Sequence, residues 1–348
     1  MKLQIGDRTI GENEPCFIIA EAGVNHNGEL GLAEELIDVA ADAGADAIKF
    51  QTFTAEKLVT PMAEKAAYQK KNDGNGSTQY EMLKRLEFSE KDFRKLSAYA
   101  KKRGLVFLST AFDDGSLELL IRLKVPAFKV PSGEITNFPY LKKIGALKRP
   151  VILSTGMADM REVEEAIACL REQGCTEIAL LHCTTSYPAP LESVNLRVMD
   201  RFRECFRLPT GYSDHTEGIL VAIAAVARGA CIVEKHITTD RSLPGPDHAA
   251  SLEPDDLREM ISSIRRVEKA LGSPEKKPDA CEYANRGIVR KSVVAAVDIP
   301  EGSLLTDRLL TLKRPGTGLE PRHLQDLVGR RTRKEIRRDT LILWDMIE

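Results

Sequence analysis

Short apolar runs rich in β-branched residues alternate with longer amphipathic stretches along most of this chain of 348 residues. Such alternation is typical of β-strands that crossover helices join into a parallel sheet. Eight runs occur within about 270 residues, and a (β/α)8 barrel has this strand number and about this length. They cover residues 17–21, 47–51, 106–110, 127–132, 151–155, 178–184, 209–215 and 232–236. A doubly wound sheet would alternate in the same way, but the phosphate-binding fingerprint GxGxxG that such a sheet carries is absent.

Nearly every run begins with apolar residues and ends in polar ones, such as Lys49, Ser154 and His215. The carboxyl ends of all barrel strands meet at one mouth, where barrel enzymes keep their active sites. We therefore expect the chemistry of this chain at the mouth. A long insertion over 54–88, which follows the second strand, would reach the same mouth, either as a lid or as a tolerated surface insertion.

Two further segments flank the predicted barrel. Residues 2–11 alternate around a Gly-Asp turn and predict a hairpin that closes the bottom of the barrel. After residue 271 a linker precedes a stretch of short strands and turns. We therefore predict an α/β chain with a TIM barrel over 1–271, a linker over 272–284 and a small β-rich domain over 285–348.

Charge and hydropathy argue against nucleic acids and membranes as partners. Fifty Lys and Arg residues are interspersed with fifty-two Asp and Glu residues, so the net charge is −2 and no basic surface is expected. The longest apolar run, 219–227, has nine residues, whereas a membrane-spanning helix needs about 20. The first residues also lack the apolar segment of a secretory signal. We expect a cytoplasmic protein that binds small molecules.

Two histidines end neighbouring strands. His215 ends the seventh run and His236 ends the eighth, so both imidazoles can reach one point at the mouth. Two imidazoles leave most of a coordination shell to water and substrate oxygens, as suits a cation that polarises a carbonyl group. Such ligands accept Mn²⁺, Mg²⁺, Co²⁺ or Zn²⁺. The alternative is that both histidines are hydrogen-bonded residues of the core.

Two lysines, Lys49 and Lys129, end strands inside a mostly apolar wall. A buried ammonium group is costly unless it is paired. The lysines therefore either form ion pairs with Glu21, Glu134 and Glu234 or hold an anionic ligand. Hydroxyl groups at other strand ends favour an anion with a phosphate and a carboxylate. These hydroxyl groups belong to Thr110, Ser132, Ser154 and Ser213.

Ordered motifs run through both parts of the chain. They are IAEAGVNHNG at 19–28, KFQT at 49–52, KVPSGE at 129–134, LSTGM at 153–157, HCT at 182–184, YP at 187–188, YSDHT at 212–216, EKH at 234–236, GPD at 245–247 and KRPGTG at 313–318. Together they resemble the sialic acid synthase family over essentially the whole chain. The last motif resembles a loop of the antifreeze-like (SAF) domain that ends these enzymes.

The resemblance implies that phosphoenolpyruvate condenses with an N-acetylated mannosamine-type sugar to give a nonulosonic acid and phosphate. It implies a divalent metal on His215 and His236, Mn²⁺ first and Mg²⁺ or Co²⁺ as alternatives. It also implies a homodimer with exchanged C-terminal domains, in which Arg314 reaches the mouth of the partner. The implied contacts to phosphoenolpyruvate are Lys49, Thr110, Lys129, Ser132, Ser154 and Ser213. The implied contacts to the sugar are Glu21, Tyr187, Asp247 and Arg314.

The chemistry also needs a carboxylate that orients or deprotonates the attacking water. Glu21 and Glu134 are both candidates, and the sequence does not choose between them. Lys129 completes the expected catalytic set as the group that holds the anion.

The identity of the sugar depends on smaller differences. Residues 183–188 read CTTSYP, and Phe50 and Phe53 flank Gln51-Thr52. Both features resemble the legionaminic acid synthase branch, whose sugar is 2,4-diacetamido-2,4,6-trideoxymannose. An apolar pocket accepts a deoxy carbon better than a pocket built to bind a hydroxyl group. We therefore expect an N,N'-diacetyllegionaminate synthase ahead of an N-acetylneuraminate synthase.

Two other classes stay open at this point. A metal-dependent aldolase or a deoxy-sugar-acid phosphate synthase would share the barrel mouth, but it would not explain the C-terminal domain. A non-enzymatic carbohydrate- or ice-binding protein would share that domain and leave His215, His236 and Lys129 without a task.

Overall fold

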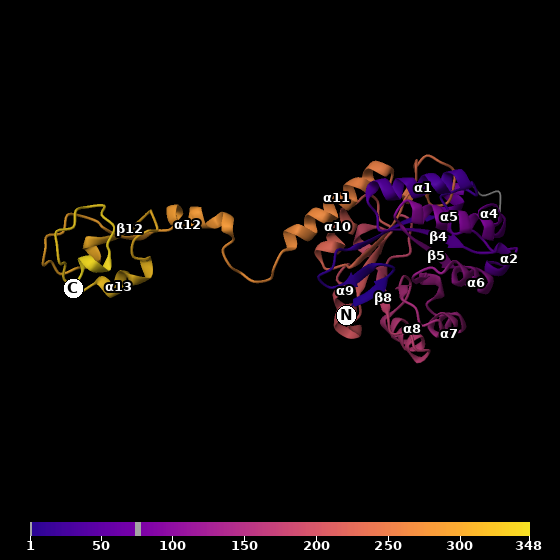
Figure 1. The fold of residues 1–348 in the computed structure, drawn as a ribbon, viewed down its shortest axis with the longest axis horizontal. Coiled ribbons are helices and arrows are strands. Elements are labelled where there is room, and N and C mark those ends of the chain that lie inside the picture. The colour runs from indigo at the N-terminus through magenta and orange to yellow at the C-terminus, as the bar shows by residue number, and fades with distance from the viewer. Residues whose placement is uncertain (1, 74–77) are drawn as a thin grey trace. The chain divides into compact units, whose positions relative to one another are not determined.

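In a computed structural model the chain divides into two compact units, residues 1–272 and 273–348. The structure describes residues 2–73 and 78–348. The first unit is a closed barrel of parallel strands with helices around it (Figure 1). Each strand pairs with the next one along the chain, and β10 pairs with β3 to close the barrel. The predicted TIM barrel is confirmed, and a doubly wound sheet is excluded.

The eight expected runs form the eight strands of the barrel. These are β3 (Phe17–Gly23), β4 (Ala47–Thr52), β5 (Val106–Ala111), β6 (Phe128–Val130), β7 (Val151–Ser154), β8 (Ile178–Cys183), β9 (Thr210–Asp214) and β10 (Ile232–His236). Only β6 is much shorter than expected. Pro131 has no N–H group for the ladder, and the next residues form the 3-10 helix η1 (Ser132–Glu134).

Helices follow the strands and cover the barrel. They are α1 (Leu30–Ala43), α2 (Ala55–Leu58), α3 (Ala67–Asp73), α4 (Gln79–Arg85), α5 (Glu90–Lys102), α6 (Asp114–Leu123), α7 (Phe138–Ala146), α8 (Met160–Glu172), η2 (Leu191–Ser193), α9 (Val198–Phe206), α10 (Leu220–Ala227), η3 (His248–Ala250) and α11 (Pro254–Leu271). Local sequence sets several of their ends. The Ser89 side chain accepts a hydrogen bond from the backbone N–H of Asp92 at the start of α5, and Gly44 ends α1 with a φ of 84°.

The inside of the barrel is apolar at one end and polar at the other. The hairpin of β1 (Lys2–Ile5) and β2 (Arg8–Gly11) buries Leu3, Ile5 and Ile10 against apolar side chains inside the barrel. The predicted hairpin is therefore confirmed, and it closes the end at which the strands begin. Since apolar side chains fill this end, the polar groups inside the barrel are left at the carboxyl ends of the strands.

The second unit has its own small core. Its elements are η4 (Ala280–Glu282), α12 (Tyr283–Val289), β11 (Ser292–Ala295), η5 (Asp307–Leu309), β12 (Leu310–Lys313), η6 (Pro321–His323), α13 (Leu324–Leu327) and η7 (Trp344–Met346). Strands β11 and β12 are antiparallel, and Val293, Ile299 and Ile342 belong to the buried cluster beneath them. Within the described ranges of both units, no helix is long and apolar enough to cross a membrane.

Candidate active site at the barrel mouth

A cavity of about 240 Å³ opens at the carboxyl ends of the strands. Eleven of the thirteen site residues expected from the sequence line it. They are Glu21, Lys49, Thr110, Lys129, Ser132, Ser154, Tyr187, Ser213, His215, His236 and Asp247. The other two lie elsewhere. The carboxylate of Glu134 accepts a hydrogen bond from Asn137 Nδ2 (2.6 Å), outside the cavity lining, and Arg314 belongs to the second unit.

Two lysines and two glutamates form a buried charge network in the cavity. Lys49 Nζ lies 2.8 Å from Glu21 Oε2 and 3.8 Å from Glu234 Oε1. Lys129 Nζ lies 3.4 Å from the same oxygen of Glu234. Burial raises the pKa of Glu21, although Lys49 opposes the shift, and burial lowers the pKa of Lys129. Both lysines are therefore ion-paired, although burial works against the charged forms of Glu21 and Lys129.

Hydroxyl groups surround this network. Lys49 Nζ donates a hydrogen bond to Thr110 Oγ1 (3.1 Å), and Ser213 Oγ donates one to Glu234 Oε1 (3.3 Å). Ser154 Oγ is buried and has no hydrogen-bond partner among the residues that the structure describes. A buried hydroxyl group without a partner is costly. The Ser154 hydroxyl is thus a donor available to a bound anion.

The Ser132 hydroxyl is held by close approach of the backbone. Its Oγ accepts a hydrogen bond from the N–H of Gly156 (2.9 Å). A Cβ atom at position 156 would lie 2.8 Å from that Oγ and 2.1 Å from Thr185 Oγ1. Only glycine fits between these two side chains, so the LSTGM motif provides both Ser154 and the space beside Ser132.

The two histidines at the strand ends lie side by side, with ring centroids 5.6 Å apart. His215 Nδ1 lies 2.8 Å from the carbonyl oxygen of Thr184, so a proton on Nδ1 leaves Nε2 with a free lone pair. His236 Nδ1 is buried and lies 3.9 Å from Asp247 Oδ2, and within residues 2–73 and 78–348 it has no hydrogen-bond partner. Burial lowers the pKa of His236 well below its usual range. A neutral imidazole is the form that binds a metal.

The two imidazoles do not form a closed metal site. In the parts of the chain that the structure describes, no group of three or more His, Cys, Asp or Glu side chains is placed to hold a metal ion. Asp247 lies beside His236, and burial raises its pKa to about 6. The pair therefore fits only a cation that takes its other ligands from substrate and solvent oxygens.

The insertion after β4 contributes to the mouth. Tyr68, on α3, stacks on Tyr187 with a centroid separation of 4.9 Å, and Asn72 Nδ2 donates to the carbonyl oxygen of Pro246 (2.7 Å). Tyr68 and Gln69 also line the cavity. The described part of the insertion thus lies at the mouth, as expected for a lid, whereas residues 74–77 in the centre of the expected loop are outside the described residues.

Sequence reasoning missed some of the lining residues. Tyr68 and Gln69 lie in an insertion whose sequence has no periodic pattern that could reveal their direction. Gln51 could have been found, and Glu234, which the sequence offered only as an ion-pair partner of the lysines, could have been placed in the lining. Glu234 lies two positions before His236 on β10, and Gln51 two positions after Lys49 on β4. Residues two apart on a strand share a face.

The expectation that Phe50 and Phe53 line the sugar pocket is wrong. Phe50 alternates with Lys49 on β4 and points outward, where it stacks on Phe107 with a centroid separation of 5.8 Å. Phe53 does not line the cavity either, although it packs in the same cluster as the apolar residues that do. The apolar part of the lining comes from Val24, Met82, Leu83, Leu86 and Phe112.

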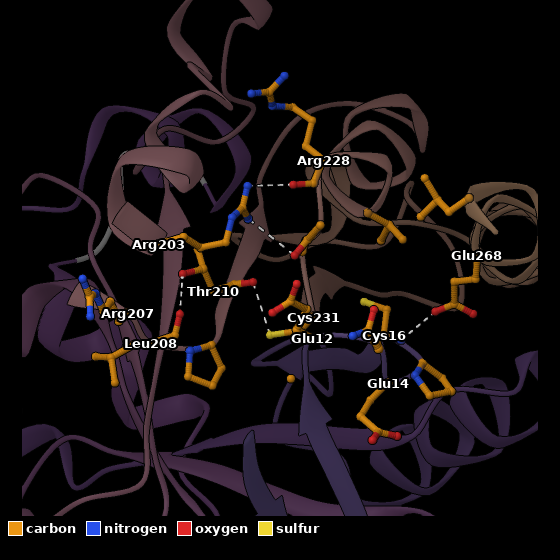
Figure 2. Close-up of a pocket in the computed structure, with 18 of the residues that line it drawn as sticks. Glu12, Glu14, Cys16, Arg203, Arg207, Leu208, Thr210, Arg228, Cys231 and Glu268 are labelled. Atoms are coloured by element: carbon orange, nitrogen blue, oxygen red, sulfur yellow. Dashed lines mark hydrogen bonds between the residues drawn. The ribbon is translucent and has the colours of Figure 1, made fainter. Parts of the chain in front are cut away.

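A larger cavity, of about 770 Å³, lies near the start of β9 and β10, at the opposite end of the barrel (Figure 2). Its polar groups largely satisfy one another. Arg203 donates to the backbone oxygens of Arg228 and Gly229, and Glu268 accepts from the N–H of Cys16. This end of a barrel serves stability, whereas the carboxyl ends of the strands carry the chemistry. We therefore assign the function to the smaller cavity.

Known proteins resemble both units of the chain. The NeuB family matches residues 36–276, and the SAF domain matches residues 290–348. The N,N'-diacetyllegionaminic acid synthase of Legionella pneumophila is 49% identical over 347 residues, which cover 99% of this chain and 98% of that protein. The human N-acetylneuraminate-9-phosphate synthase is 41% identical, over 98% of this chain and 95% of that protein.

A solved structure extends the likeness to three dimensions. The N-acetylneuraminic acid synthetase of Leptospira borgpetersenii is 36% identical and has a TM-score of 0.73, over 82% of this chain and 95% of that one. The sequence resemblance is thereby confirmed in both units. With a barrel mouth that gathers two lysines, several hydroxyl groups and two histidines, and with a C-terminal SAF domain, the chain belongs to the NeuB family.

Proposed function

We propose that this protein condenses phosphoenolpyruvate with 2,4-diacetamido-2,4,6-trideoxymannose and releases phosphate, as an N,N'-diacetyllegionaminate synthase. The observation that carries the proposal is 49% identity, over 99% of the chain, to a protein with this activity. A mouth that combines buried cations, hydroxyl donors and two imidazoles suits both reactants. The apolar lining suits a sugar with deoxy carbons, because it offers no polar group that a missing hydroxyl would leave unpaired.

Phosphoenolpyruvate would bind at the lysine end of the cavity. Its phosphate and carboxylate need cations and donors, which Lys49, Lys129, Ser132 and the unpartnered Ser154 hydroxyl offer.

A divalent cation would be held by His215 and His236, with Mn²⁺ first and Mg²⁺ or Co²⁺ as alternatives. The residues fit such an ion, because both imidazoles are within reach of one point and His236 Nδ1 has no hydrogen-bond partner in the described part of the chain. When bound, the ion would make the aldehyde carbon of the open-chain sugar more electrophilic. Tyr187 and Asp247 line the same side of the mouth and would orient the sugar.

The side chains of the mouth would position the two reactants and move one proton. Lys49 and Lys129 hold the phosphate and carboxylate so that carbon 3 of phosphoenolpyruvate faces the aldehyde carbon. Carbon 2 becomes electron-poor as this bond forms, and water adds to it and gives up one proton while the former aldehyde oxygen takes one up. The hydroxyl group on carbon 2 then loses its proton as the C–O bond to phosphate breaks, which leaves a ketone and protonated phosphate. We assign the deprotonation of this water to Glu21, which lines the cavity, rather than to Glu134, which is bonded to Asn137 outside it.

We further propose a cytoplasmic homodimer in which Arg314 of one subunit completes the mouth of the other. The expected linker over 272–284 contains η4 and the start of α12, so only the eight residues 272–279 can be extended; they could span at most about 28 Å, which gives the C-terminal domain some freedom from its own barrel. The guanidinium group of Arg314 lies in the KRPGTG motif and suits a carboxylate or an acetamido oxygen.

The test is phosphate release from phosphoenolpyruvate by the full-length protein, with mass spectrometry of the product. The acceptors are 2,4-diacetamido-2,4,6-trideoxymannose, N-acetylmannosamine or none. We expect kcat/KM to be at least about tenfold higher with the trideoxy sugar. A preference for N-acetylmannosamine would make the protein an N-acetylneuraminate synthase, and no release with either sugar would refute the proposal.

A further inference from the structure

Directly behind the two histidines, a charged pair joins the last two strands of the barrel. Lys235 precedes His236 on β10, and Asp214 ends β9 directly before His215. Lys235 and Asp214 face each other in the strand register. Lys235 Nζ donates a hydrogen bond to Asp214 Oδ2 (2.9 Å). Both side chains are fully buried, at 1% and 0% exposure.

The pair lies on the outer side of the strands, where most neighbours are apolar. Strand alternation turns His236 and Glu234 into the barrel, so Lys235 points outward, as do the core residues Val233 and Tyr212. A buried ion pair is often no more stabilising than apolar residues of the same size. Stability alone therefore does not explain a charged pair among these apolar side chains.

The pair also holds the backbone on the far side of His215. Asp214 Oδ1 accepts from the N–H of Thr216 (2.9 Å) and from Thr216 Oγ1 (2.8 Å). Lys235 Nζ donates a second hydrogen bond to the carbonyl oxygen of Thr216 (2.5 Å). His215 thus lies between Asp214, which belongs to the pair, and Thr216, which both members of the pair bind, and His236 directly follows Lys235.

We propose that Asp214 and Lys235 are positioning residues that set the separation and orientation of the His215 and His236 imidazoles for a divalent cation. They would act through the backbone, without contact to the cation or to a substrate. The inference rests on the proposed metal site at these histidines. Residues that orient metal ligands from behind commonly change metal affinity by about 10- to 100-fold when they are replaced.

Two variants distinguish a positioning role of the pair from the effect of an unpaired buried charge. Lys235→Met removes the bonds to Asp214 and Thr216 and leaves a buried carboxylate unpaired. The double variant Asp214→Leu/Lys235→Met removes both charges, so it avoids that penalty and still lacks the tether on Thr216. Arg265→Met is the matched control, because Arg265 Nη2 pairs with Asp46 Oδ2 (3.0 Å), at the end of the barrel where the strands begin.

The probe is Mn²⁺ alone, titrated into the full-length protein and followed by the electron paramagnetic resonance of the free ion. Calorimetry then gives the dissociation constant of phosphoenolpyruvate. We expect Lys235→Met and the double variant to bind Mn²⁺ about 10- to 100-fold more weakly, with unchanged affinity for phosphoenolpyruvate. Arg265→Met should bind both ligands like the wild type, even if its melting temperature falls.

His236→Ala distinguishes the two ways in which the inference can fail. If this variant binds Mn²⁺ as tightly as the wild type, the proposed metal site itself is wrong. If it loses Mn²⁺ while the double variant keeps wild-type affinity, the metal site stands and the positioning role is refuted. Equal weakening of Mn²⁺ and phosphoenolpyruvate in the double variant would also refute it, because the pair would then merely support the whole mouth.

Discussion

Replacing Lys129 with methionine removes one of the two buried cations from the mouth and keeps most of the side-chain volume. Lys129 Nζ lies 3.4 Å from Glu234 Oε1. In the variant, Glu234 retains Lys49 at 3.8 Å and the Ser213 hydroxyl at 3.3 Å. The remaining carboxylate is therefore not left without partners, and we expect the barrel to fold.

The expected loss falls on phosphoenolpyruvate. A unit charge about 4 Å from another contributes on the order of 4 kcal/mol at the effective dielectric constant of a protein surface, before desolvation is subtracted. Removal of one member of a buried charge pair costs from about 2 kcal/mol upward. We therefore expect Lys129→Met to weaken phosphoenolpyruvate binding by about 2–4 kcal/mol, which is about 30- to 1,000-fold in the dissociation constant.

Isothermal calorimetry with phosphoenolpyruvate measures this loss directly. Lys143→Met is the control, because Lys143 pairs with Asp114 at 2.6 Å on the surface, where ion pairs contribute little. It should bind phosphoenolpyruvate like the wild type. A dissociation constant of Lys129→Met within about threefold of the wild-type value would mean that Lys129 serves only Glu234, and the anion-holding role would be refuted.

Three further predictions concern the metal, the base and the dimer. His215→Ala and His236→Ala should each abolish turnover that metal restores after EDTA treatment, with unchanged circular dichroism; undiminished turnover in either variant would remove that histidine from the metal site. Burial raises the pKa of Glu21 above its ordinary 4.5, so its carboxylate form increases as the pH rises through that higher value. We expect kcat to rise over the same pH range in the wild type but not in Glu21→Gln. An identical pH profile of the two proteins would exclude Glu21 as the base. Mixed Arg314→Ala and His236→Ala chains should recover about one quarter of wild-type activity after subunit exchange, because half of the dimers then contain one intact site; no recovery would mean that each C-terminal domain serves its own barrel.

The barrel could be predicted because one pattern recurs in nearly every strand. The run is apolar where the strand begins and polar where it ends, and parallel strands bring all the polar ends together. Lys49, Ser154 and His215 therefore share one cavity although about 160 residues separate the first from the last. Composition did not help to place these side chains. It only argued against nucleic acids and membranes as partners.

The site was harder to predict where strand periodicity breaks down. Alternation cannot be applied to Glu134, five residues after Lys129, because the strand does not reach it. Strand β6 ends before Pro131, and residues 132–134 turn as a 3-10 helix. That turn brings Glu134 to Asn137 instead of the cavity. Phe50 was misplaced for the opposite reason: alternation does hold on β4, and it turns Phe50 outward since Lys49 points inward.

The contact between Asp214 and Lys235 could not be predicted from the sequence alone. The triplets Ser213-Asp214-His215 and Glu234-Lys235-His236 each have one charged residue between two that face the barrel interior. Alternation alone predicts that both charged residues point outward, but it does not predict that they meet. Their contact depends on the register that pairs Lys235 with Asp214, and a slip of one residue would place Lys235 beside a residue that faces the interior. The ion pair that holds Thr216 is therefore compatible only with the alignment of β9 and β10 that brings His215 and His236 together.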